Sequence, residues 1–252
     1  MLIIDFDKQI SIFAPGKCGS SALAYNLQNL TTNPNDFFRA QRLKFISTSA
    51  IPDNFNQLIT TQKEYFHSIP IGDSYLMYRK LYSKADNFKH YVFVREPVSR
   101  TISGFETVIN WFYSDAWLSY HSSDTTLEEL WSIAQQSNDF DYHVGPFLHR
   151  TKNLECEYIN IKSINLFLKE IYNIEAENLP SVPHWTIGIN VKEAKYNEFK
   201  REDDPKLWDT IQTQMNNFRT DAANKFDSSI RNNIITQEID LYNNLELKYD
   251  YN

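Results

Sequence analysis

The pattern of apolar positions near the N-terminus predicts a strand followed by a helix. Residues 9–14 form a short apolar run rich in β-forming side chains, which is typical of a buried parallel strand. Leu23, Leu27 and Leu30 then recur at the i, i+4, i+7 spacing that marks one face of a helix. The first predicted unit of structure is therefore a strand-to-helix junction at residues 14–21.

A second junction of the same kind follows further along the chain. Residues 90–94 form another buried apolar run, and Pro97 suits the first turn of a helix. The apolar stripe of that helix recurs at i, i+4, i+7 and i+11 and consists of Val98, Ile102, Phe105 and Ile109. Two strands thus run directly into helices, as in an α/β fold.

The remaining pattern predicts further strands and helices. Candidate strands lie at 43–47 and 64–70. Ser163 is a candidate cap for a later helix whose inward face consists of Ile164, Phe167, Leu168 and Ile171. Thr125 and Thr126 precede Glu128 and Glu129 at capping-box spacing, which explains this acidic pair as a helix start rather than a catalytic pair. Another helix opens at Asp204-Pro205, with a core stripe of Trp208, Ile211, Met215, Phe218 and Ala222. We expect an α/β fold with a central parallel sheet and helices on both faces.

The first junction has the chemistry of an anion-binding loop. Gly16 and Gly19 allow a sharp turn that brings backbone N–H groups close to a ligand. Ser20 or Ser21 can cap the helix, whose N-terminus attracts phosphate, and Lys17 adds a mobile positive charge. The predicted ligand loop comprises Gly16, Lys17, Cys18, Gly19, Ser20 and Ser21. The alternative is an ordinary strand–turn–helix with a surface lysine.

The order of residues in this loop differs from that of a Walker A motif, in which the lysine follows the last glycine. Pro15, Lys17, a small residue, Gly19 and two serines instead resemble the 5′-phosphosulfate loop of sulfotransferases, commonly Pro-Lys-Ser-Gly-Thr-Thr. One departure is the insertion of Gly16 between Pro15 and Lys17.

The second junction resembles the 3′-phosphate motif of the same family. Arg95-Glu96-Pro97 is followed by Arg100 and Ser103 in the pattern Arg-acid-Pro-x-x-Arg-x-x-Ser. The resemblance implies that Arg95 and Ser103 hold the 3′-phosphate of 3′-phosphoadenosine-5′-phosphosulfate (PAPS), the arginine through charge-assisted hydrogen bonds. Arg100 is equally well explained as a structural residue of the helix.

Later segments resemble the carbohydrate sulfotransferase group, which includes Golgi-type and bacterial enzymes. These segments are Asp141–Pro146, Glu157–Ile161, His184–Glu193 and Ile235–Tyr242. The resemblance implies a P-loop NTPase-like fold, PAPS as donor, 3′,5′-ADP as product, and a carbohydrate, glycolipid or small-molecule acceptor. No metal is expected, because the protein itself would hold both phosphate ends of the donor.

The same resemblance suggests the catalytic groups. Lys17 would stabilise charge on the departing 5′-phosphate oxygens, and His67 in Tyr-Phe-His-Ser resembles the catalytic histidine segment of some uronyl sulfotransferases. His67 would accept the proton of an acceptor hydroxyl or amine; the alternative is a half-buried structural histidine. His143 and His184 are candidates for the acceptor cleft or for structural roles. A P-loop kinase or hydrolase, and a catalytically silent nucleotide- or glycan-binding relative, remain the alternative functions.

Composition bounds these expectations. The 252 residues are 42% hydrophobic and show no linker-like stretch, so we expect a single domain over 1–252. Asp5 and Asp7 interrupt the apolar start, which argues against a signal peptide, and no apolar window is long enough to span a membrane. Two cysteines argue for a reducing compartment, and we expect a cytoplasmic protein.

Charge adds a further constraint on partners. The net charge of −7 argues against nucleic acid. Residues 1–100, which hold both phosphate motifs, carry 12 Lys and Arg against 8 Asp and Glu, whereas residues 101–252 carry 13 against 24. The basic half is therefore the half suited to anion capture. The six histidines and two cysteines lack the spacings of a zinc site.

Overall fold

The computed structural model describes residues 2–5, 8–27, 67–69, 79, 87–137, 140–175, 205–226 and 236–249. The chain forms two compact units, each made of separate segments. The first, which we call the sheet unit, comprises Met1–Arg95, Arg150–Glu177 and Asn244–Asn252. The second, the helical unit, comprises Glu96–His149 and Asn178–Asn243.

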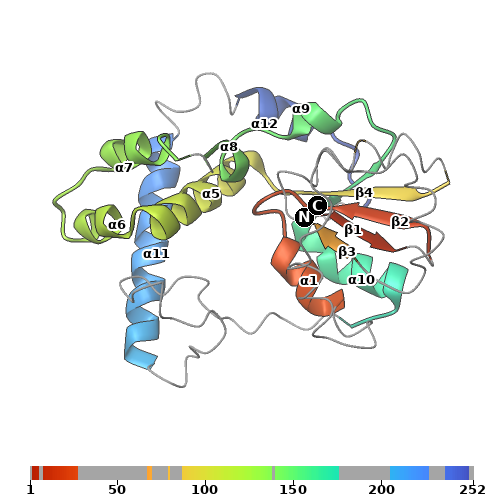
Figure 1. Ribbon diagram of the computed structural model, residues 1–252, viewed down its shortest axis with the longest axis horizontal. Coiled ribbons are helices and arrows are strands. Elements are labelled where there is room, and N and C mark those ends of the chain that lie inside the picture. Colours follow the sequence, from red (N-terminus) through yellow and green to blue (C-terminus); the bar gives the residue numbers. More distant parts are fainter. Residues whose placement is uncertain are drawn as a thin grey trace. The chain divides into compact units, whose positions relative to one another are not determined.

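A five-stranded sheet in the order β3-β1-β2-β4-β5 forms the centre of the sheet unit (Figure 1). Its strands are β1 (Leu2–Asp5), β2 (Ile10–Phe13), β3 (His67–Ile69), β4 (Lys89–Val94) and β5 (Glu157–Asn160). The predicted parallel pairing holds for β2 with β4 and for β4 with β5. The sheet as a whole is mixed, because β1 pairs antiparallel with both β2 and β3.

Among the described strands, β1 is the one that the sequence pattern did not predict. The chain reverses tightly after it: the Asp5 carboxylate accepts a hydrogen bond from the backbone N–H of Lys8 (2.9 Å), and Gln9 takes a φ of 55°. This turn joins β1 and β2 as an antiparallel hairpin. The predicted strand at 43–47 lies outside the described residues. Of the predicted strand at 64–70, the structure describes residues 67–69, which form β3.

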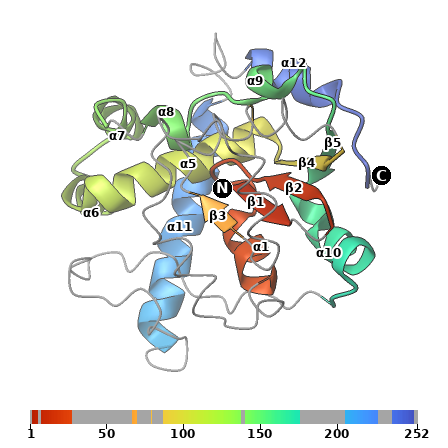
Figure 2. The same ribbon diagram turned by 45° about the vertical axis from the view of Figure 1, so that its right-hand side comes forward.

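The described helices of the sheet unit lie on one face of the sheet (Figures 1 and 2). They are α1 (Ser20–Leu27) and α10 (Ile164–Tyr172), the latter preceded by the 3₁₀ turn η3 (Ile161–Ser163). On α10 the Phe167 ring packs edge-on against Tyr91 and Phe93 of β4, with both centroids at 5.1 Å. Since Tyr91 and Phe93 are two apart on a strand, they share the sheet face that α10 covers.

The helical unit is built around α5 (Pro97–Phe112), whose predicted stripe is confirmed: Ile102, Phe105 and Ile109 are buried and Val98 packs against them. Its other helices are α6 (Ser114–His121), α7 (Leu127–Ala134), α8 (Phe140–His143), α11 (Pro205–Phe226) and α12 (Thr236–Asn243). The short helix α9 (Leu148–Thr151) begins in this unit and ends in the sheet unit.

Aromatic side chains fill the core of the helical unit. Phe218 of α11 contacts Phe105 of α5 and Trp117 of α6, with ring centroids at 5.3 and 4.7 Å. Trp117 is fully buried, so its ring is part of this core.

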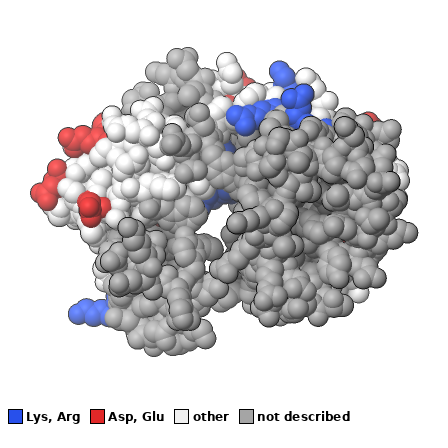
Figure 3. Space-filling model, viewed as in Figure 1, with Lys and Arg blue, Asp and Glu red and all other residues white. Residues whose placement is uncertain are grey.

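The predicted start of α7 is confirmed. Thr126 is its N-cap and forms a reciprocal capping box with Glu129. Acidic side chains gather on the outer surface of α6 and α7 (Figure 3), where Asp115, Asp124 and Glu128 are exposed. This negative surface repels an anionic ligand. We therefore expect such a ligand to bind the sheet unit instead. Among the described residues, no helix is both long and apolar enough to cross a membrane.

Candidate functional site

The loop between β2 and α1 adopts the backbone conformation of a tight turn with a lysine in a strained position. The N–H of Cys18 donates to the carbonyl of Pro15 (3.1 Å), which closes a turn with Gly16 and Lys17 at its centre. Lys17 has a φ of 66° and Gly19 a φ of 79°. The left-handed residue of the turn is therefore Lys17 rather than Gly16. A left-handed φ costs a lysine about 1–2 kcal/mol, and such strain gathers at functional sites.

Gly19 rather than a serine occupies the N-cap position of α1. The carbonyl of Gly19 accepts the first bond of the helix, from the N–H of Leu23 (3.0 Å). The expectation that Ser20 or Ser21 caps the helix is therefore wrong, because the positive φ of Gly19 already turns the chain into the helix. Ser20 and Ser21 become the first two helical residues, where backbone N–H groups point toward an incoming anion.

The loop packs firmly against the start of α10. Cys18 is fully buried. A Cβ placed on Gly19 would lie 3.6 Å from Cγ2 of Ile161 and 3.7 Å from Cδ1 of Ile164. The turn after β5 therefore supports the loop after β2, at the edge where the parallel strands β2, β4 and β5 all end. Open α/β sheets bind their ligands at this edge.

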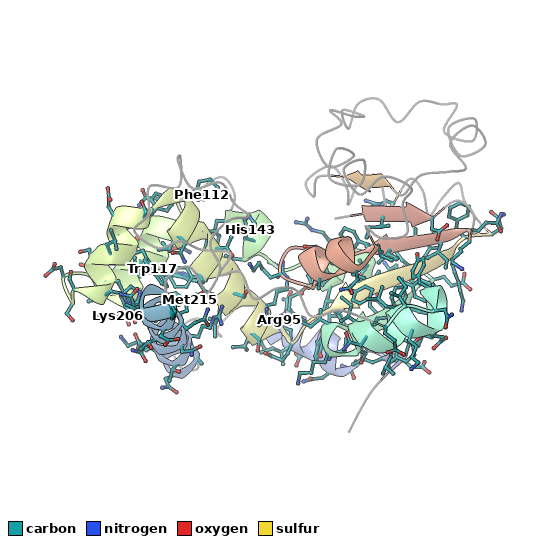
Figure 4. The ribbon with its side chains drawn as sticks, turned by 90° about the horizontal axis from the view of Figure 1, so that it is seen from below. Arg95, Phe112, Trp117, His143, Lys206 and Met215 are labelled. Atoms are coloured by element: carbon teal, nitrogen blue, oxygen red, sulfur yellow. The ribbon has the colours of Figure 1, made fainter. Side chains whose placement is uncertain are left out.

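Arg95 directly follows β4 at the same edge of the sheet unit (Figure 4). Its neighbour Glu96 is the N-cap of α5, with carboxylate oxygens that accept from the N–H groups of Val98 (2.8 Å) and Ser99 (2.7 Å). Pro97 occupies the first helical position. The acid and the proline of the Arg-Glu-Pro pattern thus build the helix start, whereas Arg95 is partly exposed and remains the predicted phosphate-binding residue.

Ser103 is buried on α5, in the helical unit, whereas Arg95 belongs to the sheet unit. Arg100 has a structural role: it is buried, its Nη1 donates to the carbonyl of Gly145 (2.8 Å), and its guanidinium lies 4.7 Å from the Phe147 ring centroid. This favours the structural interpretation of Arg100 over phosphate binding.

The backbone of His67 begins β3. The register pairs His67 with Ile4 of β1, and Ile4 in turn pairs with Ser11 of β2. His67 therefore lies level with Ser11, two residues before the carboxyl end of β2 at Phe13. Its side chain lies outside what the structure describes, so its role as base stays a prediction.

Two other histidines, His90 and His143, lie in surroundings that favour structural roles. The Nδ1 of His90 is 2.7 Å from Oγ of Ser11, between neighbouring strands, which supports a structural role for His90. His143 is buried on α8 beside α5 (Figure 4), and its carbonyl would lie 2.0 Å from a Cβ at Gly104. His184 and the rest of the predicted loop 184–193 lie outside the described residues.

Glu238 is a buried acid whose role the sequence did not suggest. Its two carboxylate oxygens accept from the N–H groups of Leu148 (3.1 Å) and His149 (3.2 Å) at the start of α9. The His149 Nδ1 lies 3.6 Å from the same carboxylate. An N-cap supplied from a helix 90 residues away leaves no local sequence pattern.

The geometry therefore combines a strained lysine loop, a helix N-terminus and Arg95 at the carboxyl ends of parallel strands. Comparison of the chain with known protein families, with curated proteins and with solved structures found no match.

Proposed function

We propose that this chain is a PAPS-dependent sulfotransferase with a P-loop-like arrangement of sheet and helices. The observation that carries the proposal is the left-handed Lys17, set between β2 and the N-terminus of α1 at the carboxyl edge of the parallel strands. This supports the proposal, because strained backbone conformations gather at functional sites and open α/β sheets bind ligands at this edge.

Lys17 is proposed as the group that stabilises the transition state. In sulfuryl transfer the acceptor oxygen or nitrogen forms a bond to sulfur while the bond from sulfur to the 5′-phosphate oxygen breaks. Negative charge then grows on the departing phosphate, and the Lys17 ammonium with the N–H groups of Ser20 and Ser21 offsets it. Such a reaction needs in-line positioning and charge stabilisation more than covalent help from the protein.

Arg95 and Ser103 are proposed to hold the 3′-phosphate of PAPS and of the product 3′,5′-ADP. The guanidinium of Arg95 suits two parallel hydrogen bonds to phosphate oxygens. This contact would distinguish the donor from nucleotides that lack a 3′-phosphate. Since Lys17 and Arg95 would supply positive charge at the two phosphate ends of the donor, no step of the proposed reaction needs a metal ion.

His67 is proposed as the base that accepts the acceptor's proton. The acceptor is a hydroxyl or amine of a carbohydrate, glycolipid or small molecule. If His67 is the base, His67→Ala lowers kcat by roughly 10²–10⁴ and removes the loss of rate near pH 6.5 that a titrating histidine causes. If that acid limb survives in the variant, the base lies elsewhere, and His143, His184 and Glu106 are tested next.

The direct test of activity is incubation with PAPS and a panel of glycans, glycolipids and metabolites. Mass spectrometry is then used to search for acceptors that gain the mass of one sulfuryl group. The proposal expects such a product with wild-type protein and almost none with Lys17→Ala. Turnover by Lys17→Ala at the wild-type rate would remove this residue from the mechanism.

A further inference from the structure

The end of the chain extends the sheet beyond β5. Leu247 forms a parallel bridge with Tyr158, and the N–H of Lys248 donates to the carbonyl of Tyr158 (3.0 Å). Together with Tyr249 these residues form a segment, Leu247–Tyr249, that we call the C-terminal clamp. It covers the edge of β5 that would otherwise expose unpaired backbone groups.

Lys248 ties the clamp to two other elements by charge. Its Nζ lies 2.9 Å from Oε2 of Glu157, at the start of β5, and 3.2 Å from Oε1 of Glu170 on α10. Glu157 also binds Lys89 at the start of β4 (3.0 Å). The Lys248 side chain is 20% exposed and lies 5.3 Å from the centroid of the buried Tyr91 ring. This network exceeds an isolated surface pair, because one ammonium serves two carboxylates and an aromatic face.

Tyr249 links the C-terminal clamp to the start of α10. Its carbonyl accepts a hydrogen bond from Oγ of Ser163 (2.8 Å), and its hydroxyl donates to the carboxylate of Glu170. Ser163 was predicted to cap α10 with its side chain. The hydroxyl binds the clamp instead, and it makes no cap hydrogen bond.

The residues that flank Ser163 touch the lysine loop. Ile161 and Ile164 are the side chains nearest to Gly19, at 3.6 and 3.7 Å from a Cβ built there. A continuous set of contacts therefore runs from Lys248 through Tyr249 and Ser163 to the turn that supports Gly19. All of these residues belong to the sheet unit.

We propose that the C-terminal clamp positions the lysine loop, with Lys248 as a positioning residue that never touches the ligand. The clamp holds η3 and the first turn of α10 in place, and these in turn fix Gly19 and the strained backbone at Lys17. The effect on PAPS binding rests on the proposed function; the effect on the loop itself does not.

The ion pairs of the C-terminal clamp persist over a wide pH range. Burial alone would lower the pKa of Lys248, but its hydrogen bonds to Glu157 and Glu170 outweigh burial and raise it. Burial works against the charged form of Glu157, but Lys248 and Lys89 outweigh it and hold its pKa below 4.5. The ion pairs are therefore intact throughout the neutral range in which sulfuryl transfer would be measured.

Cys18 provides a probe of loop order that is independent of any ligand. It is fully buried in the loop, whereas the other cysteine, Cys156, is partly exposed. In a Cys156→Ser background, an aromatic disulfide reagent reacts with Cys18 when the loop opens. We expect Lys248→Met to react roughly three- to tenfold faster than the background protein under native conditions.

Three further variants make the experiment specific. Lys248→Arg keeps the charge and is expected to restore slow labelling. Lys169→Met removes an exposed ion pair between Lys169 on α10 and Glu175 beyond the end of that helix (2.6 Å), and is expected to change nothing. Ser163→Ala removes the hydrogen bond to the Tyr249 carbonyl and is expected to speed labelling while lowering the free energy of unfolding by only about 1 kcal/mol, so the protein stays folded. This last variant keeps the test valid if Lys248→Met fails to fold.

Titration with 3′,5′-ADP separates the two proposals. If the wild type binds this nucleotide, Lys248→Met is expected to weaken binding by a similar factor. If the wild type binds none, the proposed function fails, and Cys18 labelling still decides the clamp. Labelling of Ser163→Ala and of folded Lys248→Met at the rate of the background protein would overturn the clamp proposal.

Discussion

The two units of the molecule use polar side chains in different ways. In the sheet unit several charged groups are at least partly exposed: Lys89 and Glu157 at strand starts, Lys17 in a loop and Arg95 after a strand. In the helical unit several charged groups are buried and joined to a fixed partner. Glu106, with a side chain 2% exposed, accepts from Nε (3.0 Å) and Nη2 (2.9 Å) of Arg219.

This difference separates charged groups that solvent reaches from charged groups that are buried in the core. Both hydrogen bonds from the Arg219 guanidinium reach Oε2 of Glu106 and hold this buried carboxylate in one place, so Glu106 is a structural residue first and a candidate base second. Lys17 instead lies on a strained backbone at the carboxyl ends of the parallel strands. We therefore expect substitutions of Lys17 and Arg95 to alter chemistry most, and substitutions of buried residues such as Glu106 to alter stability most.

The largest expected effect is on catalysis at Lys17. Loss of the ammonium in Lys17→Ala is expected to lower the rate of transfer by about 10²–10³, as for other single electrostatic contacts to a transition state. Lys17→Gly is expected to lose the same activity but to gain roughly 1–2 kcal/mol of unfolding free energy, because glycine adopts a φ of 66° without strain. Urea unfolding and transfer rates are measured on both variants. Equal stability of the Gly and Ala variants would contradict the strain at this position.

The second effect is on stability at Gly104. A methyl group there would lie 2.0 Å from the carbonyl oxygen of His143, so α5 and α8 must move apart in Gly104→Ala. We expect a loss of about 1–3 kcal/mol or more in urea unfolding followed by tryptophan fluorescence. Ser99→Ala, at an exposed position of the same helix, is the matched control. A wild-type midpoint for Gly104→Ala would show that the two helices are not packed this closely.

A smaller effect is expected at the capping box of α7. Thr126→Ala removes the side-chain oxygen that accepts from the N–H of Glu129 (3.2 Å). Loss of an N-cap typically costs about 1 kcal/mol. Thr126→Ser retains the oxygen and is expected to unfold like the wild type. Equal unfolding midpoints for the Ala and Ser variants would show that the cap contributes little.

The smallest effect concerns the pH dependence of the helical unit. His121 packs edge-on against Trp117 with ring centroids 4.5 Å apart, and burial lowers its pKa below 6.5. The folded state then binds fewer protons than the unfolded state, so this contribution to stability is complete above pH 6.5 and is lost as the pH falls through the lowered pKa. The difference in unfolding free energy between wild type and His121→Gln is therefore expected to shrink at acid pH. A constant difference from pH 7 to about pH 5 would contradict burial of this ring.

The sequence predicted those elements whose cause is local. The apolar stripe of α5, the capping box of α7 and the strands that end before Lys17 and Arg95 all follow from spacing within a few residues. The turn geometry was less predictable, since a left-handed lysine beside a glycine runs against local preference. The roles of Gly104 and Glu238 depend on contacts between distant segments, which no local pattern records.

The candidate site likewise has features that the sequence predicted and features that it did not. The position of the lysine loop and of Arg95 was predictable, because each follows directly from a strand end. Three features of the site were not predictable: the cap by Gly19, the C-terminal clamp around Lys248, and the position of His67 along the sheet. They depend on how separate segments pair.

The most direct test of the account is calorimetric binding of 3′,5′-ADP in the presence of a metal chelator. We expect the wild-type protein to bind it more tightly than 5′-AMP, and Arg95→Ala to lose about 2–5 kcal/mol of affinity for 3′,5′-ADP while its weaker binding of 5′-AMP hardly changes. Binding of neither nucleotide, binding only with added magnesium, or equal losses for both nucleotides in Arg95→Ala would contradict a PAPS site at this edge of the sheet.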